Sequence, residues 1–90
     1  MYVKNVSGSS RFSAPRGYRS WLEYWEEKTG KRVCRCGASG CSKIDIIGAH
    51  VQKAYSLDQH WYITPLCKSC NGRIDIFNVT TELVPVPSNL

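Results

Sequence analysis

Two of the five cysteines of this chain, Cys67 and Cys70, are separated by two residues in the segment CKSC. Two thiolates at this spacing can bind one ion from a tight turn, as in structural zinc sites. A tetrahedral site needs two more ligands, and three cysteines lie upstream. Cys36 and Cys41 enclose four small residues, GASG, whereas Cys34 and Cys36 have one residue between them. We therefore predict that Cys36, Cys41, Cys67 and Cys70 bind Zn²⁺; Cys34 is the spare thiol and the alternative to Cys36.

Two further side chains, His50 and Asn71, have the type and position to take part in chemistry. His50 follows a short apolar run, and a neutral imidazole can accept a proton near physiological pH. Asn71 comes directly after Cys70. Simpler interpretations stay open, because a histidine at the end of a strand often belongs to the core and an asparagine after a cysteine pair can cap a helix.

The length and composition of the chain favour one small domain. With 90 residues, of which 42% are hydrophobic, its core is thin enough to need support from a metal. The segment from Met1 to Arg16 lacks the apolar stretch of a signal peptide, and no apolar run is long enough to span a membrane. We therefore expect a cytoplasmic protein without a membrane partner, in which clustered cysteines stay reduced. The oligomeric state is left open.

The formal net charge is +5, with the basic excess in the first 70 residues. A basic domain suits the phosphate backbone of a nucleic acid, although ordinary solubility charge is the simpler explanation. Four basic side chains close to the cysteines and His50 in sequence are the predicted phosphate contacts: Lys43, Lys53, Lys68 and Arg73.

One helix is indicated in residues 18–32, with its start left open between Gly17 and Trp21. Its apolar side chains recur at helical spacing from Tyr18 to Trp25 and form a single stripe. Ser20 is placed to cap the start of the helix, and Gly30 is a natural stop. We expect this helix to lie as a lid on the zinc core.

Segments rich in β-branched and aromatic residues predict three strands: residues 43–51, 61–64 and 80–86. Pro65 should close the second strand, and Pro85 should confine the third to an edge of the sheet. A short helix is expected from Cys67, with Gly72 limiting its stability. Residues 1–16 are interpreted as a flexible polar and basic arm, and residues 17–90 as the single domain.

The order of these features resembles the zinc-containing branch of the HNH endonucleases. The likeness covers about residues 36–77, and the segment YITPLCKSCN is similar to the NLxPLCxxCH or CN ending of that family. It implies an α+β fold, namely a small zinc-stabilised ββα-metal domain related to the treble clef, here with an extra N-terminal helix. It also implies that His50 is the general base that activates water, that Asn71 holds a catalytic Mg²⁺ or other divalent ion, and that DNA is the partner.

Two positions depart from the family's pattern. Ala49 stands where the family usually has Asp or His as a metal ligand, and Tyr62 stands where an asparagine orients the histidine. Three side chains are candidate substitute ligands: Asp45, Asp58 and His60. Three functions therefore stay open. The first two are an HNH-type endonuclease and a catalytically inactive zinc module that makes protein or regulatory DNA contacts. The third, a zinc ribbon or treble-clef regulator, would use the cysteines alone and give His50 no role.

Overall fold

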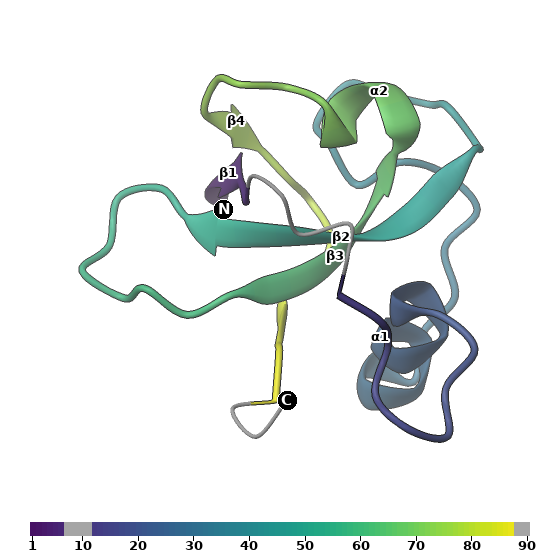
Figure 1. The fold of residues 1–90 in the computed structure, drawn as a ribbon. Coiled ribbons are helices and arrows are strands. Elements are labelled where there is room, and N and C mark those ends of the chain that lie inside the picture. Colours follow the sequence, from purple (N-terminus) through teal and green to yellow (C-terminus); the bar gives the residue numbers. More distant parts are fainter. Residues whose placement is uncertain (7–11, 88–90) are drawn as a thin grey trace.

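The computed structural model describes residues 1–6 and 12–87, which form a five-stranded antiparallel sheet and two helices (Figure 1). The strands lie in the order β4-β1-β2-β3-β5. Their bounds are as follows: β1 Tyr2–Asn5, β2 Ile46–Lys53, β3 Tyr62–Cys67, β4 Phe77–Asn78 and β5 Val84–Pro85. Helix α1 (Trp21–Thr29) and helix α2 (Lys68–Asn71) lie on opposite sides of the β2–β3 hairpin. The predicted small α+β architecture is confirmed at this level.

The β2–β3 hairpin carries both hydrophobic cores, one on each side. Its register runs from Ile46 opposite Cys67 to Val51 opposite Tyr62. Because side chains alternate along a strand, Ala49 and Val51 join the core that contains the cysteines, whereas Ile63 joins the core under α1. β2 starts later and runs further than the predicted segment 43–51, since Lys53 still pairs with β1.

Pro65 does not close the second strand, contrary to the prediction, but lies inside β3 opposite Gly48. A proline lacks the N–H that a neighbouring strand would need, so it requires an unpaired side of its strand. β5 pairs only with Tyr62 and Ile63, and this leaves the other side of Pro65 without a strand. There the Pro65 carbonyl accepts a hydrogen bond from the Gly37 N–H at 2.8 Å.

The prediction of a flexible arm over residues 1–16 also needs correction at its start. Tyr2–Asn5 form β1, which pairs with both β2 and β4, and Val3 is fully buried. Only one apolar side chain of this short strand faces the core, so its pattern was too weak to recognise in the sequence. Residues 7–11 of the predicted arm lie outside the described part of the chain.

Helix α1 begins and ends as predicted. Ser20 is its N-cap and accepts a hydrogen bond from the Glu23 N–H, and Gly30 ends it with a positive φ of 69°. The helix is not a lid on the cysteines, however. Its buried face packs with Ile63 and Val84 on the other side of the sheet, because the cysteine loop crosses to the opposite side before β2 begins.

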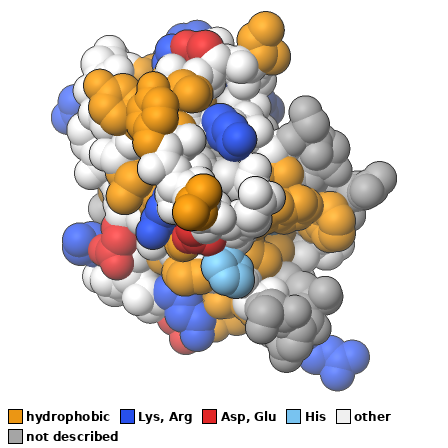
Figure 2. Space-filling view, turned by 90° about the vertical axis from the view of Figure 1, so that its left-hand side faces the viewer, with side chains coloured by type: hydrophobic (Ala, Val, Ile, Leu, Met, Phe, Trp, Pro, Cys, Tyr) orange, Lys and Arg blue, Asp and Glu red, His pale blue; other side chains and the backbone are white. Residues whose placement is uncertain are grey.

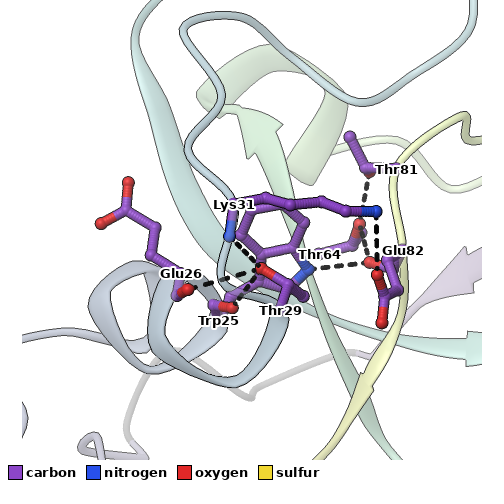
Figure 3. A network of polar contacts seen from close by, with 7 residues as sticks. All are labelled: Trp25, Glu26, Thr29, Lys31, Thr64, Thr81 and Glu82. Carbon is purple, nitrogen blue, oxygen red and sulfur yellow. Dashed lines mark hydrogen bonds and ion pairs between the residues drawn. The ribbon is translucent and has the colours of Figure 1, made fainter.

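A polar network fastens the far end of α1 to β3 and to the chain before β5 (Figure 3). The Glu82 carbonyl accepts hydrogen bonds from the Trp25 indole N–H at 2.8 Å and from the Thr64 hydroxyl at 3.1 Å. Thr64 also contacts the Thr81 hydroxyl at 2.6 Å, and Lys31 forms an exposed ion pair with the Glu82 carboxylate at 3.2 Å. These part-buried bonds therefore fasten α1 to the hairpin.

Candidate metal centre and the adjoining hollow

The four cysteines predicted as ligands come together in space. The sulfur atoms of Cys36, Cys41, Cys67 and Cys70 all lie within 4.8 Å of one another. The Cys41 and Cys67 sulfurs are 3.9 Å apart. Four thiolates about 2.3 Å from a tetrahedral zinc ion would have their sulfurs about 3.8 Å apart. The arrangement therefore suits one tetrahedral ion, and Cys34 is exposed and outside the group.

Two segments of the chain bring these sulfurs together. Cys67 ends β3 and Cys70 lies in α2, where the Cys67 sulfur accepts the Cys70 N–H at 3.3 Å and thereby caps the helix. Cys36 and Cys41 lie on the loop after α1, which turns tightly through a hydrogen bond from the Cys41 N–H to the Ala38 carbonyl at 3.0 Å. A hydrogen bond from the Cys67 N–H to the Cys36 sulfur, at 3.2 Å, joins the β3–α2 segment to the loop after α1.

Burial disfavours the charged form of two of the four thiols. Burial raises the pKa of Cys70 to about 12 and also raises the pKa of Cys36. The pKa of Cys67 is lowered: burial acts to raise it, but the donors around its sulfur, among them the Cys70 N–H, outweigh that effect. A bound divalent ion would supply the positive charge that four adjacent thiolates require.

His50 lies in an aromatic environment on the side of the sheet that faces α1. It is 5% exposed, and its ring meets Trp21 edge-to-face at 4.9 Å and Trp61 at 5.7 Å. Burial lowers the pKa of His50, so the imidazole is neutral near physiological pH. Its Nε2 atom is buried without a hydrogen-bond partner among the described residues.

His50 and Asn71 line one hollow of about 180 Å³, which we call the His50–Asn71 hollow. The other lining residues come from β2, from the start of α1 and from the segment before it: Phe12, Trp21, Ile47, Gly48 and Ala49. β1 pairs only with residues 51–53 of β2, so these β2 residues lie beyond the end of β1. The structure thus brings together the two side chains that the sequence singled out for chemistry.

Asn5 ties the N-terminal strand to the helix that carries Asn71. Its side-chain amide donates to the Cys70 carbonyl at 3.0 Å and to the Arg73 carbonyl at 2.8 Å. The Cys70 carbonyl also accepts the Arg73 N–H at 3.1 Å, so Asn5 adds a second donor to this carbonyl and a donor to the Arg73 carbonyl just beyond α2. Sequence reasoning missed this residue because a single asparagine in a polar segment carries no signal of a contact so distant along the chain.

Tyr62 and Asp58, considered as substitutes for the missing family positions, contact each other, and the other two candidates, Asp45 and His60, are exposed. Tyr62 donates its hydroxyl hydrogen bond to Asp58, not to His50, and Lys53 lies 4.9 Å from the centre of the Tyr62 ring. The Tyr62 and His60 bonds lower the pKa of Asp58, which also pairs with Lys53 at 3.9 Å. Together these contacts close the β2–β3 loop and provide no ligand beside His50.

Two of the four predicted phosphate contacts, Lys53 and Arg73, are already engaged by acidic side chains. Arg73 forms a 2.5 Å ion pair with Asp75 and lies over the Phe77 ring. On the face in Figure 2, Lys and Arg side chains are scattered among hydrophobic and neutral ones, with acidic side chains beside several of them. Lys43 and Lys68 are exposed, and Lys68 lies one helical turn before Asn71.

The catalytic divalent ion that the family resemblance implies does not fit the side chains present. Mg²⁺ and similar hard ions take several oxygen ligands, normally with at least one carboxylate. The residues that line the His50–Asn71 hollow include no acidic side chain, and Ala49 is buried in the cysteine core. Among the described residues, the four cysteines form the one group of three or more potential ligands. The side chains of this hollow therefore do not provide a second metal site.

Comparison with known proteins gives no further guide. No family model, curated protein or solved structure matches the chain. No helix in the described residues is long and apolar enough to cross a membrane.

Proposed function

We propose that the protein is a zinc-stabilised nucleic-acid-binding module that engages a phosphodiester backbone at the His50–Asn71 hollow without hydrolysing it. The ion in the cysteine group is Zn²⁺, which four thiolates at tetrahedral spacing favour. The order of β2, β3 and α2 matches that of the ββα-metal fold and supports descent from an HNH-type domain.

The observation that carries the proposal is the meeting of His50 from β2 and Asn71 from α2 in one hollow. The cysteine group holds α2 at its start, so the metal sets the position of Asn71. Lys68 on the same short helix adds an exposed positive charge, and the chain as a whole carries a net charge of +5. An anionic ligand therefore meets hydrogen-bonding groups and a favourable charge at this place.

Binding without cleavage follows from the side chains of the site. A hydrolytic site of this type needs a metal to stabilise the charge that develops on the phosphate and the leaving oxygen. The hollow provides His50 and Asn71 but no carboxylate. Moreover, the pair of tryptophan rings around His50 replaces the polar partner that would orient a general base.

Fluorescence anisotropy with a labelled oligonucleotide over a range of salt concentrations tests the binding. We expect the affinity to fall as salt rises, because phosphate contacts release counterions. Lys68→Ala should weaken binding and reduce the salt slope by about 1. Lys31→Ala is the matched control, since Lys31 is paired with Glu82 near the end of α1. No binding at low salt, or equal losses in both variants, would refute the proposed interface.

Incubation of the zinc-loaded protein with plasmid DNA and Mg²⁺, Mn²⁺ or Ni²⁺ tests the second half of the proposal. We expect no nicking with any ion, and native mass spectrometry should give one zinc per chain. Nicking that is lost in His50→Ala would show instead that the chain is an active endonuclease.

A further inference from the structure

A second hollow of about 150 Å³ lies beside the His50–Asn71 hollow and shares Phe12, Trp21 and His50 with it. We call it the aromatic hollow. Its remaining lining consists of one more aromatic residue and two residues that directly follow β5: Trp61, Val86 and Pro87. Apart from the imidazole of His50, every side chain of this hollow is apolar or aromatic.

The rings of this hollow are arranged edge-to-face around its walls. Phe12 meets Trp61 at 5.3 Å, and both Trp21 and Trp61 meet His50. Phe12 is 42% exposed and Trp61 is half-buried, so a flat ring that stacks on these side chains would remove aromatic surface from water. His50 offers the one polar ring, and its buried Nε2 has no partner among the described residues.

The volume of the hollow indicates the size of the ring that would fill it. An apolar cavity of about 150 Å³ is large enough for a single benzene-sized ring. The adjoining His50–Asn71 hollow is the proposed place of a phosphate, so a ligand that spans both hollows has one aromatic ring within one sugar unit of a phosphate. A pyrimidine nucleotide has this form, whereas the two-ring base of a purine nucleotide is larger.

We propose that the aromatic hollow receives a pyrimidine base of single-stranded nucleic acid, whose phosphate lies in the His50–Asn71 hollow. The inference rests on the proposed function and names its substrate class. A base within a duplex is stacked between its neighbours and paired along one edge, so it enters a recessed site only after it is unstacked and unpaired. Single strands present their bases directly, and stacking on aromatic side chains is their usual mode of binding.

Three probes of equal length separate the parts of this proposal: a thymidine 12-mer, a deoxyadenosine 12-mer and a 12-mer of abasic tetrahydrofuran units. All three carry the same phosphates. We expect the thymidine strand to bind about 10- to 100-fold more tightly than the abasic strand, the range that stacking of one base provides. It should also bind more tightly than the deoxyadenosine strand, and it should change the tryptophan fluorescence.

Trp61→Leu should bring the affinity for the thymidine strand down to that for the abasic strand. Tyr55→Leu is the matched control, because Tyr55 is an aromatic residue of the β2–β3 loop that is 78% exposed and does not line the hollow. Phe12→Leu provides a second test if Trp61→Leu loses its zinc or its circular dichroism signal. The Phe12→Leu variant should show a smaller difference in affinity between the thymidine and abasic strands.

The outcomes distinguish the proposed base site from the proposed phosphate binding on which it rests. Equal binding of all three strands would overturn the base pocket and leave phosphate binding intact. No binding of any strand would overturn the proposed function itself. Preference for the deoxyadenosine strand would refute the size argument, and an unchanged preference for thymidine in Trp61→Leu and Phe12→Leu would place the base elsewhere.

Discussion

Gly48 of β2 lies directly against the backbone of Trp21 at the start of α1. A Cβ atom at position 48 would stand 2.5 Å from the Trp21 carbonyl carbon, with the Leu22 backbone nitrogen equally close. Only a residue without a side chain allows the helix to approach the strand here. This contact places Trp21 beside His50, two residues further along β2, and so shapes both hollows.

Gly48→Ala should therefore force α1 away from the sheet. We expect the free energy of unfolding to fall by about 1–3 kcal/mol, the usual cost of overpacking against backbone. Urea denaturation followed by circular dichroism measures this change. Gly72→Ala is the control, because a Cβ there would meet only ordinary contacts at 3.5 Å or more. Equal stability of the two variants would contradict the close approach.

Substitutions of Cys34 and Cys36, which lie close together in the sequence, should have different effects on the metal centre. Cys36→Ser should abolish zinc binding and cooperative folding, since its sulfur belongs to the group and accepts the Cys67 N–H. Cys34→Ser should leave both unchanged, because Cys34 is exposed and outside the group. Native mass spectrometry and thermal unfolding with and without a chelator measure both. A folded, zinc-loaded Cys36→Ser protein would move the ligand assignment to Cys34.

Asn5→Ala should weaken the connection between β1 and α2. The change removes two part-buried hydrogen bonds, although the Cys70 carbonyl keeps the Arg73 N–H, and each such bond contributes about 0.5–1.5 kcal/mol. We expect lower stability and, because α2 carries Cys70, faster release of zinc to a chelator. Lys4→Ala on the same strand is the control, as Lys4 is exposed. Identical zinc release from both variants would argue against this role of Asn5.

His50 should make the stability depend on pH. Its pKa is lowered in the folded protein by burial, so the unfolded chain binds a proton at this residue more readily. The contribution is complete above the ordinary pKa of about 6.5 and is lost as the pH falls below it. His50→Phe removes this titration, so the stability of the wild type relative to the variant should decrease from about pH 7.5 to about pH 5.5.

Denaturation of both proteins at saturating zinc measures this difference. Protonation of the cysteines affects the wild type and His50→Phe alike and therefore cancels in the comparison. A stability difference that stays constant over this range would show that burial does not shift the pKa of His50.

The sequence alone identified the features that depend on neighbours along the chain. The Cys67 and Cys70 pair, the Ser20 cap and the Gly30 stop are local, because each is defined by spacing over a few residues or by backbone conformation. The prediction of Cys36 as the ligand instead of Cys34 also rested on a local feature, because the four small residues before Cys41 allow the turn that brings Cys36 into the group.

Tertiary structure decided which surfaces meet. The pairing of β1 beside β2, the placement of α1 opposite the cysteines and the tolerance of Pro65 within β3 all depend on contacts between segments far apart in the chain. The hollows have the same origin, since they form where β1 ends and Gly48 admits α1. A local pattern indicates which side chains a segment can bury, but the packing of the whole chain determines which other segment buries them.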